Sequence, residues 1–221
     1  MKNRIREFIY RRYNISFSKA GDDIQLKQLL KATSPGTYVD IGCWHPVKAS
    51  NTYYFYLRNW KGICIDPNPQ LKMLYQKTRP KDIFINSGIA LRNETKEYIM
   101  FEESSINTFS EEFVKSHNLT TSIIHRIKTP VAPLAEILSR QLGPTDRLDF
   151  FDIYVEGMDL EVLRTNDWKK FRPRVVLIET DLSIKDEVDS EISEYLFQQD
   201  YKLIGKSVIN GNLGNLFFIT S

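Results

Sequence analysis

The 221-residue sequence lacks the features that mark extracellular, membrane-spanning and nucleic-acid-binding proteins. Its only cysteines are Cys43 and Cys64, too few for a disulfide framework, and its N-terminus has no uninterrupted apolar core of the secretory type. No apolar run approaches the roughly 20 residues that a membrane-spanning helix needs. The 30 Lys and Arg nearly balance the 28 Asp and Glu, so the composition predicts no nucleic-acid partner. We therefore expect a cytoplasmic protein.

Repeats, low-complexity tracts and linkers rich in Pro, Gly or Ser are also absent, which predicts a single domain over residues 1–221. The 42% of hydrophobic residues suffice for one core. Residues 1–30 are expected to form an N-terminal helical extension, in which Met1 to Tyr13 mixes basic and apolar residues as in an amphipathic helix. This helix either contacts a membrane surface peripherally or docks on the domain with its arginines in solvent.

Beyond Thr37, short β-rich runs alternate with helical patterns, which is typical of a parallel sheet covered by helices. The predicted strands are 37–41, 62–66, 83–86, 148–155 and 174–179. The predicted helices are 51–59, 70–77, 134–142, 158–164 and 191–198. Residues 202–204 and 216–219 flank the turn-rich stretch around Gly211, which predicts a hairpin. We expect an α/β fold with a mostly parallel seven-stranded sheet, an antiparallel C-terminal hairpin and helices on both faces.

Polar residues follow the first predicted strands, at the edge where open α/β sheets bind ligands. Asp40 and Gly42 end the first strand, where a tight glycine turn lets the backbone approach the amino-acid part of a ligand. Asp66 ends the second strand, where a carboxylate can accept both hydroxyls of a ribose. Ser87, after the third strand, can meet an adenine edge. The alternative is that Asp40 and Asp66 cap the turn and the helix that follow them.

The most specific segment is Ile153-Tyr154-Val155-Glu156-Gly157, a strand that turns into an acidic helix start. Together with other blocks in the right order, it resembles the FkbM-type methyltransferases from about Gly21 to Phe218. The other blocks are 40–46, 50–53, 60–69, 106–110, 166–168 and 172–179. The resemblance implies a Rossmann-like class I methyltransferase fold and O-methylation of hydroxyls on sugars, glycans or secondary metabolites, with S-adenosylmethionine (SAM) as methyl donor.

The resemblance also implies roles for individual residues. The cofactor positions that it assigns are Asp40, Gly42, Asp66, Asn51 and Ser87. Glu156 and Glu179 match acidic positions at strand ends, where similar enzymes have catalytic or metal-binding groups.

Tyr154 departs from the family pattern, which usually has aspartate at this position. A hard cation such as Mg²⁺ or Mn²⁺ takes oxygen ligands, so the loss of a carboxylate weakens a metal-assisted mechanism. Three interpretations follow. The enzyme uses a metal-independent general base, it uses a metal held by Glu156, Glu179 and His45, or it is a SAM-binding module that Tyr154 has inactivated.

His45 is the best-placed histidine for a general base, because it follows the first strand and histidine titrates near neutral pH. Its alternative role is a structural hydrogen bond that shapes the turn. Glu156 is the other candidate base. Its position at a predicted helix start stabilises the carboxylate, which suits an orienting or metal-binding role better.

The segment 102–133 interrupts the alternation of strands and helices, and we expect it to cover the acceptor. Asn107 and Thr108 are its candidate substrate contacts. The alternative is an ordinary helical insertion that packs on the sheet edge.

Two further functions fit the sequence less well. A dinucleotide or nucleotide-sugar enzyme would need a glycine-rich phosphate turn, which residues 43–46 do not provide. RNA methylation would need a basic stripe interleaved with aromatic residues. The sequence therefore predicts a SAM-dependent O-methyltransferase of glycan biosynthesis that acts on a carbohydrate hydroxyl.

Overall fold

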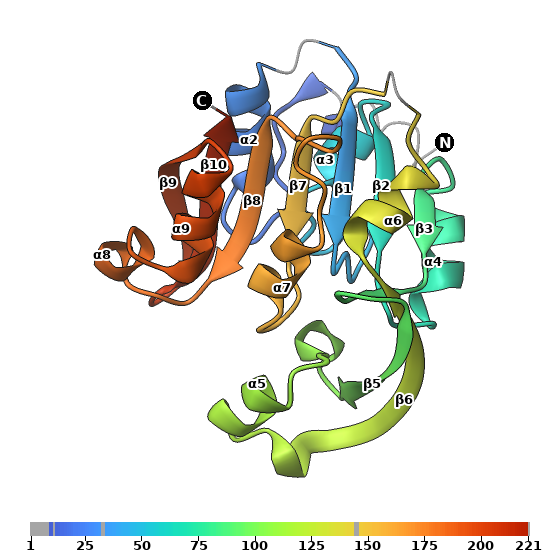
Figure 1. The fold of residues 1–221 in the computed structure, drawn as a ribbon. Helices are drawn as coiled ribbons and strands as arrows, with labels where there is room; N and C mark the ends of the chain where they lie inside the picture. Colours follow the sequence, from blue (N-terminus) through green and yellow to red (C-terminus); the bar gives the residue numbers. More distant parts are fainter. Residues whose placement is uncertain (1–8, 11, 32–33, 144–145, 221) are drawn as a thin grey trace.

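Seven strands form the main sheet, in the order β3-β2-β1-β7-β8-β10-β9 (Figure 1). The computed structural model describes residues 9–10, 12–31, 34–143 and 146–220. The strands are β1 (Thr37–Ile41), β2 (Lys61–Ile65), β3 (Ile83–Ile85), β7 (Phe150–Ile153), β8 (Val175–Thr180), β9 (Tyr201–Asn210) and β10 (Leu213–Thr220). β10 runs antiparallel to both β8 and β9, whereas the other neighbouring pairs are parallel. The predicted Rossmann-like methyltransferase fold with its antiparallel hairpin is confirmed.

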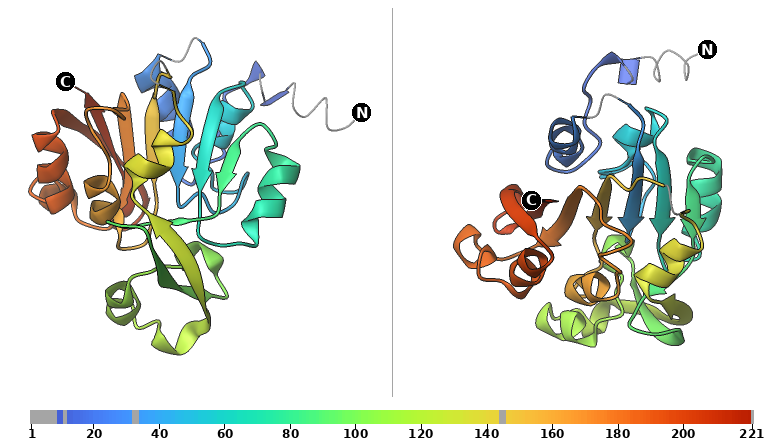
Figure 2. Two further views of the ribbon diagram at one scale, coloured as in Figure 1. Left: turned by 45° about the vertical axis from the view of Figure 1, so that its right-hand side comes forward. Right: turned by 45° about the horizontal axis from the view of Figure 1, so that its top comes forward.

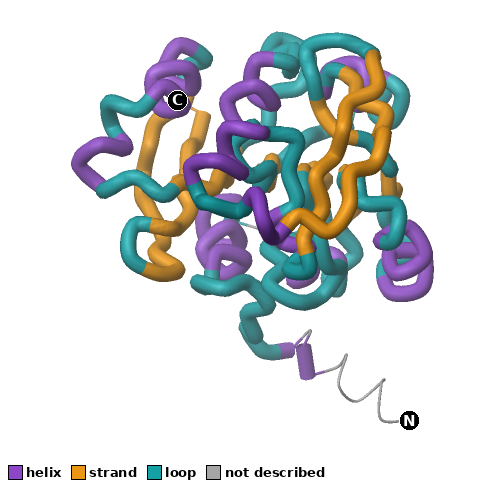
Figure 3. Tube along the Cα trace, turned by 90° about the horizontal axis from the view of Figure 1, so that it is seen from below, coloured by secondary structure: helices purple, strands orange, loops and turns teal. Residues whose placement is uncertain are grey.

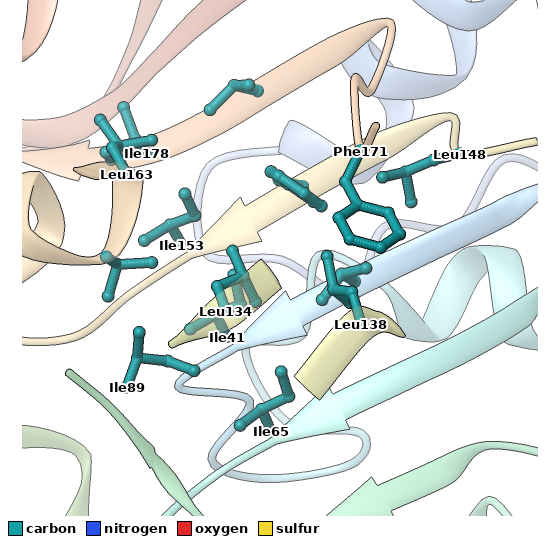
Figure 4. Packing of buried hydrophobic residues seen from close by; sticks show 14 of the residues in the cluster. Ile41, Ile65, Ile89, Leu134, Leu138, Leu148, Ile153, Leu163, Phe171 and Ile178 are labelled. Carbon is teal, nitrogen blue, oxygen red and sulfur yellow. The ribbon is translucent and has the colours of Figure 1, made fainter. Parts of the chain in front are cut away.

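Helices cover both faces of this sheet, because successive side chains of a strand point to opposite sides. The helices that pack on it are α2 (Asp22–Leu30), α3 (Tyr53–Tyr56) and α4 (Leu71–Thr78) on one face, and α6 (Leu134–Ser139), α7 (Asp159–Arg164) and α9 (Glu191–Gln198) on the other. A short helix, α8 (Ile184–Glu187), precedes α9. Figure 4 shows the second face, where Ile41, Ile153 and Ile178 of three adjacent strands pack with Leu134 and Leu163.

A second, three-stranded sheet, here called the inserted sheet, comes between β3 and α6 in sequence. Its strands are β4 (Gly88–Ile89), β6 (Ile123–Ala132) and β5 (Glu94–Phe101), with β6 in the middle. Between β5 and β6 lie η1 (Ser104–Ile106), α5 (Glu111–Ser116) and η2 (Thr120–Ser122). Figures 1 and 2 show the inserted sheet beyond the ends toward which the parallel strands point, and Figure 3 looks onto it from below. The predicted insertion over 102–133 contains η1, α5, η2 and β6, and β6 pairs with β4 and β5, which precede it in sequence.

Most predicted elements occur, with changes at their ends. β1 and α9 have the predicted bounds, whereas the predicted helix over 51–59 shortens to Tyr53–Tyr56. It ends early because the chain turns into β2 through Asn59, whose φ of 65° is left-handed. Within the predicted N-terminal extension, α2 packs Leu26 and Leu30 against the sheet.

The predicted basic helix over residues 1–13 lies largely outside the described residues. Across the part of the chain that is described, no helix combines the length and the apolar character needed to cross a bilayer.

Candidate active site

Gly42 forms the turn after β1, and no other residue fits there. Its φ of 77° is left-handed, and a Cβ at this position would lie 1.7 Å from the carbonyl oxygen of Tyr154. The Gly42 N–H donates to the carbonyl of Ile65 at 2.9 Å. The absence of a side chain therefore lets the exits of β1, β2 and β7 approach one another closely.

Asp66 follows β2, and backbone groups hold both of its carboxylate oxygens. Oδ2 accepts from the Trp44 N–H at 3.0 Å, and Oδ1 accepts from the Asn68 N–H at 2.8 Å. Helix α4 has no side-chain cap, so Asp66 does not have the capping role of the alternative interpretation. Burial raises the pKa of Asp66 to about 7. Each oxygen retains lone-pair capacity for a ligand hydroxyl.

A cavity with an empty volume of about 540 Å³, the first cavity, opens beside Asp66. Ser87 lines it from the turn after β3, and the Ser87 hydroxyl donates to the carbonyl of Gly88 at 2.9 Å. Asn107 and Thr108 line the same cavity from the loop between η1 and α5, within the connection from β5 to β6. The structure thus brings these two candidate substrate residues next to the candidate cofactor residues Asp66 and Ser87.

A second cavity of about 580 Å³ adjoins the first, since Gly42, Trp44 and Tyr154 line both. Asp40 and Asp152 lie side by side in it, as register partners on β1 and β7. Burial raises the pKa of Asp40 to about 6. Burial, with the charge of Asp40, also holds the pKa of Asp152 well above its ordinary value. A cationic ligand group would stabilise the ionised forms of this buried pair.

The loop before α3 orients the two carboxyls. Asn51 Nδ2 donates to Asp152 Oδ1 at 3.0 Å, and Thr52 Oγ1 donates to Asp40 Oδ2 at 2.5 Å. Asp40 is therefore held by a neighbouring loop and is not a cap of its own turn. Sequence reasoning missed Asp152. The available signal was one acidic residue within an apolar strand, but only the register of β7 against β1 shows that it faces Asp40.

Arg79, a fully buried arginine, supports the same loop. Its guanidinium pairs with Asp82 at 2.7 Å and donates to the Tyr38 hydroxyl at 2.6 Å. It also donates to Thr52 Oγ1 at 3.0 Å, and Thr52 in turn contacts Asp40. Sequence reasoning missed Arg79 as well, because it belongs to none of the recognised blocks.

His45 lies in the same turn but lines none of the three cavities described here. Its Nδ1 accepts from the Val47 N–H at 3.0 Å and the Lys48 N–H at 2.9 Å. Burial, then the charge of Lys48, lowers the pKa of His45. This geometry favours the turn-shaping role over the role of general base.

Glu156 and Glu179 line both the second cavity and a third, larger one of about 1460 Å³. Glu156 has a left-handed φ of 39°, and its carbonyl accepts from Thr108 Oγ1 at 2.8 Å. Burial and the neighbouring Glu179 raise the pKa of Glu156 to about 8. Burial raises the pKa of Glu179 to about 6, against the opposing charge of Lys19. A carboxyl group with a pKa near neutrality is suited to accept a proton from a bound hydroxyl.

Of the three candidate metal ligands, Glu156 and Glu179 line the same two cavities, but His45 lines neither of them. Within the residues that the structure describes, no group of three or more His, Cys, Asp or Glu side chains is arranged to hold a metal ion. The structure therefore does not support a metal held by Glu156, Glu179 and His45.

Tyr154 lines both the first and the second cavity. Burial, with the charge of Asp152, holds its pKa well above the ordinary value, and a hydrogen bond with Asn51 opposes this shift. Tyr154 therefore presents a neutral phenol where the family pattern has a carboxylate.

A comparison with known protein families identifies the family of this chain. The family described as "Methyltransferase FkbM domain" matches residues 38–203, which is more than half of the chain. The chain therefore belongs to the FkbM methyltransferase family, and SAM is the methyl donor that this membership implies. No curated protein sequence matches the chain.

Solved structures with a similar fold share little sequence with this chain. A precorrin-6y C5,15-methyltransferase from Geobacter metallireducens is 12% identical, with a TM-score of 0.47, over 90% of this chain and 87% of that one. A 1,6-didemethyltoxoflavin-N1-methyltransferase from Burkholderia thailandensis, solved with S-adenosylhomocysteine, is 11% identical, with a TM-score of 0.49, over 92% of this chain and 78% of that one. A TehB-like SAM-dependent methyltransferase from Corynebacterium glutamicum is 9% identical, with a TM-score of 0.44, over 90% and 87%.

Proposed function

We propose that this chain is a SAM-dependent O-methyltransferase that methylates a hydroxyl of a sugar or glycan. The observation that carries the proposal is the position of Glu156. It lies on the wall shared by the second and third cavities, and its pKa is raised to about 8. A proton acceptor thus lies between the space suited to the cofactor and the larger space suited to the acceptor.

The first and second cavities suit the cofactor. Asp66, with both oxygens fixed by backbone N–H groups, would accept hydrogen bonds from the ribose hydroxyls. Asp40 and Asp152, whose pKa values are raised by burial, would hold the ammonium group of the methionyl end. SAM supplies an already activated methyl group on its sulfonium sulfur, so the protein needs to position the acceptor and remove its proton.

Glu156 is the proposed general base. In its ionised form it would accept the proton of the acceptor hydroxyl, and its raised pKa makes it a stronger base than an ordinary carboxylate. Thr108 Oγ1 donates a hydrogen bond to the Glu156 carbonyl, and this bond stabilises the left-handed backbone of Glu156. Glu179 would act on Glu156 through its charge, because that charge is the second cause of the raised pKa.

The third cavity favours a neutral, polyhydroxylated acceptor over an anionic one. Its wall carries the carboxyl groups of Glu112, Glu156, Asp159, Glu179 and Asp181, with Lys19 as a cation on the same wall. Phosphate or carboxylate groups of an acceptor would be repelled by this wall. A sugar hydroxyl can instead donate hydrogen bonds to it.

Cytoplasmic function is part of the proposal. Cys43 and Cys64 are both buried, and neither forms a disulfide. A reducing compartment accounts for such a pair. Peripheral membrane contact through the basic N-terminal helix stays a prediction, because that helix lies largely outside the described residues.

A SAM-binding but inactive module is the second candidate. Tyr154 favours it, since this side chain lines both cofactor cavities in place of the usual carboxylate. Such a module would bind S-adenosylhomocysteine and transfer no methyl group to any acceptor.

The test is methyl transfer from radiolabelled SAM to matched oligosaccharides, either neutral or carrying uronic acids, by the wild type and by Glu156→Gln. We expect label in alkali-stable methyl ethers of the neutral sugars, and a loss of rate of at least about 100-fold in Glu156→Gln with cofactor affinity retained. Label confined to acidic sugars, or a Glu156→Gln variant as fast as the wild type, would contradict the proposal. Cofactor binding with no transfer to any member of the panel would favour the inactive module.

A further inference from the structure

Asn107 carries a buried amide with an unused hydrogen-bond donor. The residue is 7% exposed, and its Oδ1 accepts from the Phe101 N–H at 2.8 Å. Because Oδ1 accepts this bond, the oxygen end of the amide faces the Phe101 backbone and Nδ2 points away from it. Nδ2 finds no hydrogen-bond partner among the described residues. A buried donor without a partner is costly, which suggests that a ligand supplies the acceptor.

The wall around Asn107 is suited to a flat aromatic ring. Tyr98 and Phe109 line the first cavity with it, and their rings pack at 4.8 Å between centroids. Phe109 can approach because Gly88 has no side chain there, since a Cβ on Gly88 would lie 2.4 Å from the Phe109 ring. Burial holds the pKa of the Tyr98 hydroxyl well above its ordinary value, and the neighbouring Asn107 amide opposes this shift.

The polar groups of the first cavity complement one another. Ser87 donates its hydroxyl hydrogen to the carbonyls of Gly88 and Pro130, so toward the cavity its oxygen can only accept. Asn107 Nδ2 can only donate. Adenine offers both partners, an exocyclic amine that donates and ring nitrogens that accept. Asp66, the proposed ribose acceptor, lines the same cavity, so the base of a bound nucleoside would extend from it toward these two groups.

We propose that Asn107 recognises the adenine ring of the cofactor by donating a hydrogen bond from Nδ2 to a ring nitrogen. This inference rests on the proposed function, and it places nucleobase recognition on the insertion rather than on the parallel sheet. The insertion is tied to the cofactor turn by a second contact, in which Trp44 Nε1 donates to Ser104 Oγ at 2.9 Å. Ser105, the next residue, lines all three cavities. Adenine recognition would therefore also position a wall of the acceptor cavity.

The test combines ligand and protein variants in calorimetric titrations. The ligands are S-adenosylhomocysteine and its 1-deaza, 3-deaza and 7-deaza analogues, in each of which a C–H replaces one ring nitrogen. The informative variant is Asn107→Asp, which keeps the Oδ1 acceptor for Phe101 and replaces the Nδ2 donor by a carboxyl oxygen. The matched control is Asn93→Ala, an exposed asparagine of the same insertion that lines none of the three cavities. Thermal unfolding of each variant shows whether it is folded.

We expect one deaza analogue to bind the wild type about tenfold more weakly than S-adenosylhomocysteine, the effect of one lost hydrogen bond. In Asn107→Asp this difference should vanish or reverse, whereas Asn93→Ala should keep it. If the wild type binds S-adenosylhomocysteine and all three analogues show the same ratios in Asn107→Asp, the inference is wrong and the proposed function stands. If the wild type binds none of the four ligands, the proposed function itself fails, and this inference with it.

Discussion

The parallel sheet and the inserted sheet contribute different chemistry to the same cavities. The parallel sheet supplies carboxyl groups at strand ends, held by backbone and loop hydrogen bonds, as at Asp40 and Asp66. The inserted sheet and the connection between its strands β5 and β6 supply the opposite wall, with the aromatic rings of Tyr98 and Phe109 and the amide of Asn107. In the proposed division of roles, the first sheet binds the ribose and methionyl groups of the cofactor, while the insertion contacts the base and borders the acceptor.

The largest expected effect separates two left-handed glycines of the parallel sheet. Gly42→Ala brings a Cβ to 1.7 Å from the Tyr154 carbonyl, whereas at Gly211, in the hairpin turn, no atom lies within 4 Å. We expect Gly42→Ala to lower the free energy of unfolding by more than about 4 kcal/mol, and Gly211→Ala by about 1–2 kcal/mol from the backbone alone. Urea titrations of the two variants measure the difference. Equal losses would show that the β1 exit is not crowded as described.

Arg79→Met tests the buried network under the cofactor turn. It leaves Asp82 buried without its cation, so we expect a loss of about 3–5 kcal/mol in the free energy of unfolding. The matched variant in the inserted sheet is Arg126→Met, which removes ion pairs with Glu97 and Glu111 at the surface and should change stability little. Urea titration again provides the measurement. A stable Arg79→Met variant would remove the argument that this network positions Asp40.

Asp66→Ala tests the ribose assignment of the parallel sheet. We expect S-adenosylhomocysteine to bind about 1–3 kcal/mol more weakly, because hydrogen bonds to a charged group are lost. Asp167→Ala is the control, since Asp167 lines none of the three cavities. Isothermal calorimetry measures both. Unchanged affinity in Asp66→Ala would assign the ribose to another residue.

The smallest effect is the dependence of stability on pH. Asp66 and Glu156 have pKa values of about 7 and about 8 in the folded protein, above the ordinary values of both groups. At a pH between the unfolded and the folded pKa, the folded state binds more protons than the unfolded state, and this difference stabilises the fold. The stabilisation is lost as pH rises through about 7 to 8. The melting temperature without ligand should therefore fall from about pH 4.5 to about pH 8 and level off above it. Asp66→Asn should flatten the fall, and a melting temperature that rises over this range would contradict the pKa assignments.

The two sheets also differ in how far the sequence predicted them. The parallel strands were predicted to within a few residues, because β-rich, mostly apolar runs such as those of β1 and β2 end at Gly42 and Asp66. The strands of the inserted sheet were not predicted. β6 contains Pro130, which argues against a strand. The first half of β5, residues 94–97, consists of polar residues alone, a pattern that reads equally well as a loop.

The candidate site, too, could be predicted only in part from the sequence. Asp40, Gly42, Asn51, Asp66 and Ser87 line the first two cavities, and their assignment to the cofactor remains a prediction. Asp152 and Arg79 were missed because their positions follow from strand register and from long-range burial, which no local motif encodes.

The most direct test of the division between the two sheets is a calorimetric titration of S-adenosylhomocysteine into the wild type, since both sheets line the first cavity. We predict micromolar binding, on the order of −8 kcal/mol. No detectable binding at millimolar ligand would contradict the account, because the carboxyl groups and the Asn107 amide would then face a cavity that takes another ligand or none.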